Sequence, residues 1–296
     1  MNRQLLYATT PIIELKSALL IESGVRMLIK REDRNHKHAC GNKWWKLKYN
    51  LEEALRLEHK TLLTFGGAYS NHIYATAAAA KELGLKSIGI IRGEETARSN
   101  HTLAFAECCG MKLHFISREE YRLKTEEPFI QKLHDQYGDF YLIPEGGTNA
   151  LAVKGVAEFA KQLITEIDFD YLCLPVGTGG TMAGIVQGFK GARNIMGFSA
   201  LKGGGFLNDE VKKWTEEAFD NWSIVENYHF GGYAKATKEL VNFVEKMETQ
   251  YQLPLDRVYT AKMFFGILDL IQKDYFKTGS TILVLHTGGL QGTILR

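Results

Sequence analysis

Short apolar stretches alternate with amphipathic stretches along almost the whole chain, and this pattern limits its fold more than any other feature. The apolar stretches have the length and the flanking residues of buried strands, and they cover residues 27–30, 62–65, 87–91, 112–116, 171–175, 195–199 and 281–285. The amphipathic stretches predict helices over residues 44–57, 71–83, 103–109, 156–164, 181–190, 235–250 and 263–273. Such alternation predicts parallel sheets with crossover helices, hence an α/β fold.

The chain has 296 residues, which is enough for a large core and favours two subdomains over one. It contains five prolines and no low-complexity segment or internal repeat that would mark a linker. We expect a break near Gly146 and Gly147, because these glycines follow a strand that ends at Pro144.

Charge and composition argue against several classes of function. A net charge of +2 is too small to indicate nucleic acid or an anionic membrane surface as a partner. No apolar run approaches the ~20 residues needed to cross a bilayer. The first residues lack the basic and apolar blocks of a signal peptide, so we expect a cytoplasmic protein. Metal-ligand spacing is absent from the cysteines, so we expect reduced thiols and no metal site at Cys40, Cys108, Cys109 and Cys173.

Lys43 is the first residue whose surroundings indicate chemistry. Gly41 and Asn42 permit a tight turn, and the helix that follows has an apolar stripe formed by Trp44, Leu47, Leu51 and Leu55. A lysine in the buried first turn of such a helix is partly desolvated, which lowers its pKa and favours imine chemistry. Lys46 and Lys48 are the alternatives, and spacing alone does not exclude them.

A glycine cluster lies between a buried strand and the next helix, and it comprises Gly177, Thr178, Gly179, Gly180 and Thr181. A strand, a glycine turn and a helix form an anion site from unpaired N–H groups and the helix dipole. The dinucleotide fingerprint does not fit, because Met182 stands where its third glycine belongs and no acidic residue ends the next strand. No Walker lysine is present either. A phosphate monoester therefore fits this loop better than a dinucleotide.

The lysine and the glycine loop together point to pyridoxal 5′-phosphate (PLP). PLP is an aldehyde that needs an amine partner, and its phosphate needs backbone N–H donors. A non-catalytic protein that binds a small anion is the alternative from a different class.

A second strand-to-helix turn follows Gly66 and Gly67, and it leads into an alanine-rich helix. One interpretation is that Ser70 is only the N-cap of this helix. The other is that the helix start holds a substrate carboxylate through Ser70, Asn71 and His72, beside the cofactor. The local sequence does not decide between them.

Three further residues are candidates for the site. Tyr233 and Tyr259 are tyrosines in glycine-rich or polar surroundings, and such tyrosines more often belong to a core or a rim than to catalysis. Thr287 closes the last buried strand, where α/β folds place ligand contacts.

Taken together, these motifs make the chain resemble the tryptophan-synthase-β-like PLP enzymes of fold type II. Within that family it is most similar to 1-aminocyclopropane-1-carboxylate (ACC) deaminases and D-cysteine desulfhydrases. The likeness covers nearly the whole chain and runs through residues 10–11, 30–33, 41–43, 66–67, 70–71, 177–181, 259 and 286–289.

The resemblance implies a two-domain α/β fold in which each domain is a mostly parallel sheet flanked by helices. Residues 1–45 with 148–296 would form the larger, PLP-binding domain, and residues 46–147 the smaller one. It also implies a small amino-acid substrate and a homodimer.

The family's functional residues fall on positions already singled out. The Schiff-base lysine falls on Lys43, the asparagine beside the pyridoxal O3′ on Asn71, and the phosphate loop on residues 177–181. The active-site serine falls on Ser70. The two active-site tyrosines fall on Tyr233 and Tyr259, which would orient the substrate or protonate the leaving group.

Two positions distinguish the branches. ACC deaminases resemble one another in having a glutamate at the position of Thr260, where it reaches the pyridine nitrogen, and a leucine at Thr287. D-Cysteine desulfhydrases look like this chain at both positions. Trp44 and Trp45 depart from both branches, which commonly have Thr-Arg there, and this departure puts the equivalence of the pocket in doubt.

A threonine hydroxyl leaves the pyridine ring nearer neutral than a carboxylate does, which weakens carbanion stabilisation. The sequence therefore favours β-elimination of the D-cysteine desulfhydrase type, in which freed Lys43 removes the α-proton and the products are pyruvate, ammonia and sulfide. An ACC deaminase, or another enzyme of this fold such as an amino-acid racemase, is the alternative.

Overall fold

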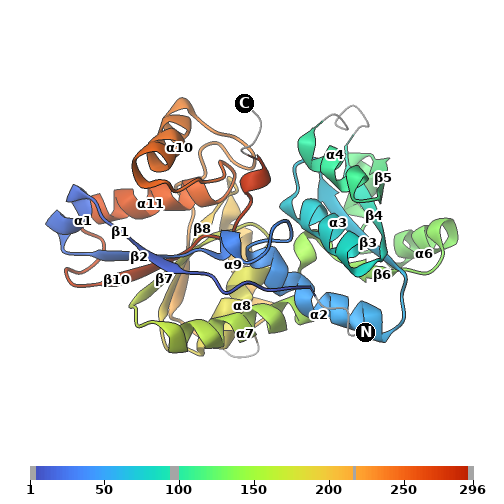
Figure 1. The fold of residues 1–296 in the computed structure, drawn as a ribbon, viewed down its shortest axis with the longest axis horizontal. Helices are drawn as coiled ribbons and strands as arrows, with labels where there is room; N and C mark the ends of the chain where they lie inside the picture. The colour runs from blue at the N-terminus through green and yellow to red at the C-terminus, as the bar shows by residue number, and fades with distance from the viewer. Residues whose placement is uncertain (1–4, 94–99, 216–217, 293–296) are drawn as a thin grey trace.

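The computed structural model describes residues 5–93, 100–215 and 218–292, and its strands form two sheets (Figure 1). The larger sheet has the order β1-β2-β10-β7-β8-β9. Its strands are β1 (Ile12–Leu15), β2 (Arg26–Lys30), β10 (Thr281–Leu285), β7 (Tyr171–Val176), β8 (Asn194–Ser199) and β9 (Trp222–Val225). All neighbouring strands in it are parallel except β1 and β2.

The smaller sheet has the order β5-β4-β3-β6 and is parallel throughout. Its strands are β3 (Thr61–Gly67), β4 (Lys86–Arg92), β5 (Met111–Ile116) and β6 (Tyr141–Ile143). The α/β architecture predicted from the alternating pattern is therefore confirmed.

Helices connect and cover the two sheets (Figure 1). Those of the smaller sheet are α3 (Asn71–Leu83), α4 (His101–Cys108), α5 (Arg118–Arg122) and α6 (Glu127–Tyr137). The others are α1 (Ala18–Ser23), α2 (Asn42–Arg56), α7 (Ala150–Glu166), α8 (Gly180–Phe189), α9 (Leu207–Lys212), α10 (Lys238–Tyr251) and α11 (Thr260–Gln272). None of the described helices is long and apolar enough to cross a membrane.

The strands of the larger sheet are apolar on both faces because both faces are covered. Along β10, Leu283 and Leu285 pack in the core under α2, α7 and α8, whereas Ile282 and Val284 pack in the core under α10 and α11. A strand buried on both faces reads as a continuous apolar run, which explains why the sequence shows it so clearly.

Helix α2 links the two halves of the molecule, and it packs on α7. A Cβ atom at Gly155 of α7 would overlap the carbonyl oxygen of Trp45, so only glycine permits this close approach. Lys48 of α2 also pairs with Glu158 of α7 at 2.7 Å. We propose that the whole of α2 belongs to the larger domain, so that the smaller domain begins after α2 and not at residue 46. The boundary expected at residue 147 stays a prediction.

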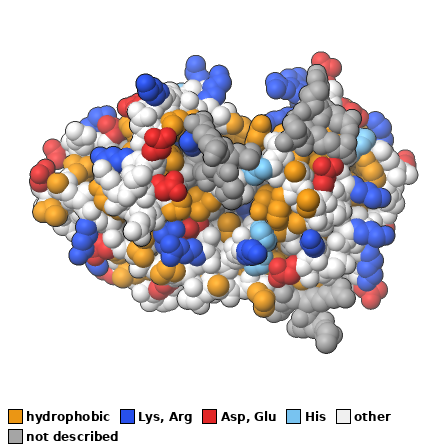
Figure 2. Space-filling model, turned by 45° about the horizontal axis from the view of Figure 1, so that its top comes forward, with side chains coloured by type: hydrophobic (Ala, Val, Ile, Leu, Met, Phe, Trp, Pro, Cys, Tyr) orange, Lys and Arg blue, Asp and Glu red, His pale blue; other side chains and the backbone are white. Residues whose placement is uncertain are grey.

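Lys and Arg side chains are scattered among Asp and Glu side chains on the face of the molecule that Figure 2 shows. This mixed surface agrees with the small net charge of +2.

Candidate active site

A cavity of about 560 Å³ lies between the two sheets, at the carboxyl ends of parallel strands. This is the place where α/β folds bind ligands. Most of the residues singled out from the sequence line it, namely Lys43, Ser70, Asn71, His72, Gly177, Thr178, Gly179, Thr181, Tyr233, Tyr259 and Thr287. Gly180 and Thr260 are not among the residues that line it.

Lys43 is the second residue of α2, and a glycine turn fixes its position. Gly41 has a φ of +70°, and a Cβ atom there would overlap the carbonyl oxygen of Thr287, so the turn requires glycine. Lys43 Nζ lies 3.4 Å from Asn42 Oδ1. Burial lowers the pKa of Lys43 to about 8, while the charge of Asp256 acts in the opposite direction. A fraction of this amine is therefore unprotonated near neutral pH.

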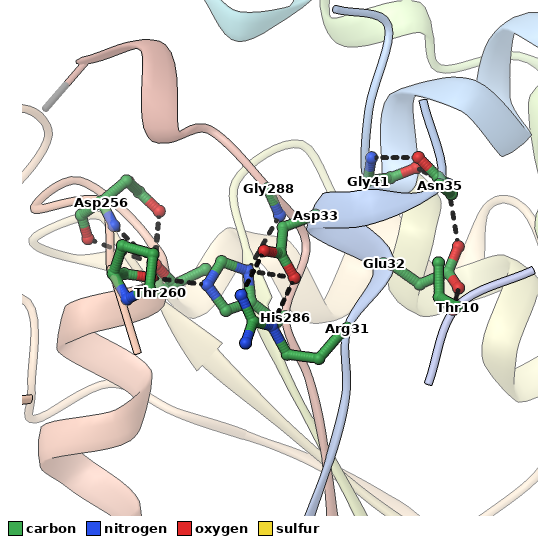
Figure 3. A network of polar contacts seen from close by, with 11 residues as sticks. Thr10, Arg31, Glu32, Asp33, Asn35, Gly41, Asp256, Thr260, His286 and Gly288 are labelled. Atoms are coloured by element: carbon green, nitrogen blue, oxygen red, sulfur yellow. Dashed lines mark hydrogen bonds and ion pairs between the residues drawn. The ribbon is translucent and has the colours of Figure 1, made fainter. Parts of the chain in front are cut away.

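Residues 30–35 hold the turn at Gly41 in place through hydrogen bonds. The side chain of Asn35 accepts a hydrogen bond from Gly41 N at 2.8 Å and donates to Gly41 O at 3.1 Å. Asn35 also donates to the buried carboxylate of Glu32 at 2.9 Å, and Glu32 accepts a further hydrogen bond from Thr10 at 2.5 Å (Figure 3). This network sets the start of α2 and hence the position of Lys43.

The other two lysines of α2 differ in their surroundings. Lys48 pairs with Glu158 and does not line the cavity. Lys46 lines the cavity, is fully buried and donates to Thr148 Oγ1 at 2.9 Å. Burial, reinforced by the charge of Lys43, lowers the pKa of Lys46 well below its usual value. Lys46 forms no ion pair with any carboxylate that the structure describes.

The glycine loop ends β7 and starts α8 beside Lys46. Gly179 is left-handed, with a φ of +78°, and it is the N-cap of α8. A Cβ atom at Gly180 would lie 2.7 Å from Thr148 Cγ2 and 3.2 Å from Lys46 Nζ, so the chain passes directly against the ammonium. Thr181 Oγ1 accepts a hydrogen bond from Asn42 at 2.8 Å, which joins the loop to the start of α2.

A buried lysine amine without an acidic partner, at the N-terminal end of a helix, fits a phosphate, whose negative charge would favour the protonated amine. The residues of the glycine loop therefore fit the phosphate group of PLP. From the sequence, Lys46 was considered only as an alternative to Lys43 for the lysine that forms the imine. Its spacing of three residues from Lys43, one helical turn along the same face, is the signal that could have placed both in one pocket.

The start of α3 forms another wall. Ser70 Oγ accepts hydrogen bonds from the N–H groups of His72 and Ile73, at 3.2 and 3.3 Å, so it is the N-cap of α3 and also lines the cavity. Its hydroxyl proton remains available to a ligand. Asn71 Oδ1 accepts a hydrogen bond from Gln291, which leaves Asn71 Nδ2 as a donor.

The ring of His72 is oriented away from the role of a carboxylate ligand, and a contribution of His72 to substrate binding stays a prediction. Thr64 donates its hydroxyl proton to Ile143 O at 2.7 Å, so it accepts from His72 Nε2, also at 2.7 Å. Burial and the charges of Lys43 and Lys46 lower the pKa of His72 well below its usual value, so the ring is neutral. Its Nδ1 is then an acceptor, without a partner among the described residues, and it is unsuited to bind a carboxylate.

Tyr233 and Tyr259 lie together on the side formed by the larger sheet. Their ring centroids are 6.1 Å apart, and the Tyr259 ring lies against Gly177, where a Cβ atom would approach it to 3.0 Å. Burial raises the pKa of both phenols. Both are therefore proton donors near neutral pH.

The two threonines that distinguish the branches are placed differently. Thr287 lines the cavity. Thr260 is fully buried, donates its proton to Asp256 Oδ2 at 2.7 Å and accepts from Asp256 N at 2.9 Å (Figure 3). Burial raises the pKa of Asp256, and its hydrogen bonds with Thr260 oppose that rise. Because the hydroxyl proton of Thr260 is donated to Asp256, it is not free for a ring nitrogen. A contact between Thr260 and the pyridine ring stays a prediction.

Next to Thr287 in the sequence, His286 takes part in a buried network of polar side chains that holds the end of β10. His286 Nε2 lies 2.8 Å from Pro254 O, and its Nδ1 lies 3.6 Å from Asp33 (Figure 3). Asp33 in turn pairs with Arg31 through two hydrogen bonds of 2.8 and 2.7 Å. These contacts join the segment after β2 to the end of β10, where Thr287 lines the cavity.

Trp44 and Trp45 lie outside the cavity, contrary to the concern raised by the sequence. Trp45 donates to Glu32 at 2.7 Å and packs against Phe159, with ring centroids 5.1 Å apart. Trp44 donates to Leu6 O at 2.9 Å. Neither residue lines the cavity, so their departure from the family pattern changes the packing of α2 on its neighbours instead.

Four charged residues of the described cavity lining were missed from the sequence: Arg92 at the end of β4, Lys124, Glu145 and Glu210. Lys124 and Glu145 form an ion pair at 3.4 Å. No local pattern marks them, and only the carboxyl end of a strand could have pointed to Arg92.

A family model described as pyridoxal-phosphate dependent enzyme matches residues 3–288. Among known proteins, the chain is 32% identical over 288 residues to a putative ACC deaminase of Pyrococcus horikoshii, covering 92% of this chain and 87% of the relative. It is also 32% identical over 297 residues to the bifunctional D-cysteine desulfhydrase/ACC deaminase, mitochondrial, of Arabidopsis thaliana, covering 92% and 74%. Among solved structures, an ACC deaminase homologue matches with a TM-score of 0.84 and 30% identity, covering 98% of this chain and 93% of the other.

Proposed function

Because the chain belongs to the family of pyridoxal-phosphate dependent enzymes and has the type II fold of tryptophan synthase β, we propose that it is a D-amino-acid lyase. The reaction is β-elimination of the D-cysteine desulfhydrase type, in which D-cysteine and water give pyruvate, ammonia and hydrogen sulfide. PLP is its cofactor, as the sequence predicted.

This choice rests on one observation: neither carboxylate among the described residues that line the cavity lies beside Thr287. Glu145 and Glu210 are the carboxylates among the described residues that line the cavity. Glu145 pairs with Lys124, and Glu210 lies beside Gly179 of the phosphate loop. Neither is placed to contact a ring nitrogen beside Thr287, so the ring would be a weak electron sink, which suits a good leaving group such as a thiolate.

When bound, PLP supplies an aldehyde for the substrate amine and an electron sink for negative charge at Cα. Lys46 and the N–H groups at the start of α8 would hold its phosphate, and Asn71 Nδ2 would donate to its ring oxygen. Thr287 would contact the ring on the side of β10.

Lys43 is the base in this proposal. Its pKa of about 8 leaves Nζ partly unprotonated near neutral pH. Lys43 would hold the cofactor through the aldehyde and, once the substrate amine has taken its place there, would be free to take the proton from Cα. Ser70 Oγ and Asn71 N–H would hold the substrate carboxylate at the start of α3. Tyr233 or Tyr259, both protonated, would give a proton to the departing group.

The test is keto-acid release from two substrates. We expect pyruvate from D-cysteine and little or no 2-oxobutyrate from ACC. Turnover of ACC that matches or exceeds turnover of D-cysteine would favour the ACC deaminase, the alternative that the names of two relatives support. A purified protein without the yellow colour of bound PLP, even after reconstitution, would contradict both.

The homodimer and the cytoplasmic location expected from the sequence are also proposals. Sedimentation of the holoenzyme tests the first, and cell fractionation tests the second.

A further inference from the structure

Arg92 is a cation at the cavity that the proposed chemistry does not use. It is the last residue of β4, and its exposed side chain lines the cavity. Its guanidinium lies 5.4 Å over the ring of Tyr121. One of its terminal nitrogens would lie 3.6 Å from a Cβ atom at Gly67, which places the guanidinium over the turn before α3.

Arg92 forms no ion pair with any residue that the structure describes. The nearby carboxylate of Glu145 is already paired with Lys124. Among the residues that the structure describes, four basic and two acidic side chains line the cavity: Lys43, Lys46, Arg92 and Lys124 against Glu145 and Glu210. Lys43 and Lys46 serve the cofactor in the proposed function and Lys124 has an acidic partner, so Arg92 is the remaining cation and has no acidic partner in the described part of the chain.

The charge of Arg92 reaches the tyrosine side of the cavity. Arg92, Tyr233 and Tyr259 line the same cavity. The charge of Arg92 also lowers the pKa of Tyr233, against the larger raising effect of burial. Tyr233 stands beside Tyr259, where the proposed function places the departing group. Arg92 therefore faces the region beyond Cβ of a substrate whose carboxylate is held at Ser70.

We propose that Arg92 is a specificity residue for amino acids that carry a second negatively charged group beyond Cβ. Its planar guanidinium is stacked on Tyr121 and so is oriented to bind a carboxylate, or another anion of that shape, through two hydrogen bonds. This inference rests on the proposed function, because the orientation of the substrate comes from it.

Aspartate and asparagine test the inference, because they have the same shape and differ in side-chain charge. The Kd of each is measured from the change in visible absorbance of the holoenzyme, for both enantiomers. We expect the wild type to bind aspartate about tenfold more tightly than asparagine. Arg92→Gln should bring this ratio to one or below, and Arg92→Lys should retain part of it. Arg56→Gln, an exposed arginine on the far end of α2, is the control and should leave the ratio unchanged.

Two outcomes would overturn the inference. If the wild type binds aspartate no better than asparagine, or binds neither, the cavity does not select for a second anion. If Arg92→Gln weakens both ligands equally, Arg92 binds the carboxylate that they share. Absence of pyruvate from D-cysteine with an intact aspartate preference would instead reject the lyase and leave the role of Arg92 standing.

Discussion

The ammonium nitrogen of Lys46 lies 2.9 Å from the hydroxyl oxygen of Thr148, a contact that joins α2 to the turn before α7. No carboxylate in the described part of the chain accompanies this pair. Burying this amine without a counter-charge costs stability and lowers its pKa, and a bound anion would offset both effects. Under the proposed function, that anion is the phosphate of the cofactor.

Lys46→Met should weaken PLP binding by about tenfold or more, because a hydrogen bond to a charged group contributes about 1.5–3 kcal/mol. Titration of the cofactor-free protein with PLP measures the change. Lys48→Met is the matched control, since Lys48 pairs with Glu158 away from the cavity. Equal PLP affinity in the wild type and Lys46→Met would show that another group holds the phosphate.

The same substitution should have the opposite effect on the cofactor-free protein. Lys46→Met removes the burial cost of the ammonium and keeps the length of the side chain, so the free energy of unfolding should rise by about 1 kcal/mol. Urea unfolding without PLP measures it. A lower free energy of unfolding would mean that the Thr148 contact outweighs the burial cost.

Lys43→Ala should still bind PLP through Lys46 and the glycine loop, but it should lose the visible absorbance of lysine-bound cofactor. Absorbance spectra of the two alanine variants decide the assignment. Should Lys46→Ala lose the band while Lys43→Ala keeps it, Lys46 would be the lysine that joins the aldehyde.

The rate at which the cofactor-free protein combines with PLP should rise with pH around a midpoint near 8. The sign follows from the amine: below its pKa of about 8 Lys43 is protonated and unreactive, and above that pKa it is free to attack the aldehyde. Stopped-flow absorbance from pH 6 to 10 measures the profile. A midpoint near the ordinary lysine value would show that Lys43 is not desolvated.

The two threonines should respond differently to loss of their hydroxyl groups. Thr260→Val removes a donor to the buried Asp256 and should lower the free energy of unfolding by about 1–3 kcal/mol. Thr287→Val should leave stability within about 0.5 kcal/mol and instead shift the visible absorbance of bound PLP. Urea unfolding and spectra of both variants test this, and a spectral change confined to Thr260→Val would restore Thr260 as the ring contact.

The α/β fold could be predicted because most strands are buried on both faces and so form uninterrupted apolar runs. β1 and β9 escaped prediction for the opposite reason, since they are short edge strands with many half-buried positions. The strand β6 was expected only from its end at Pro144, because its three residues are too few to show a period.

The site was predictable where a turn requires glycine, as at Gly41 and Gly179, because such positions leave a mark in the sequence. Asp256 leaves no such mark. Lys46 and Arg92 leave only weak ones, a spacing of one helical turn and the end of a strand, because what matters about each is a missing or shared partner in space. Thr260 shows the limit of family resemblance: its position matches the pattern, but its proton is directed at Asp256, four residues earlier.

The overlap that excludes a side chain at Gly41 has a consequence for how the protein is made. The carbonyl that touches this glycine belongs to Thr287, just after β10, and β10 is the last strand that the structure describes but lies between β2 and β7. A ribosome must therefore release the chain as far as residue 287 before the turn at Gly41 is closed. Nascent chains that end before residue 281 lack the middle of their larger sheet and so cannot capture the cofactor at Lys43 while still tethered.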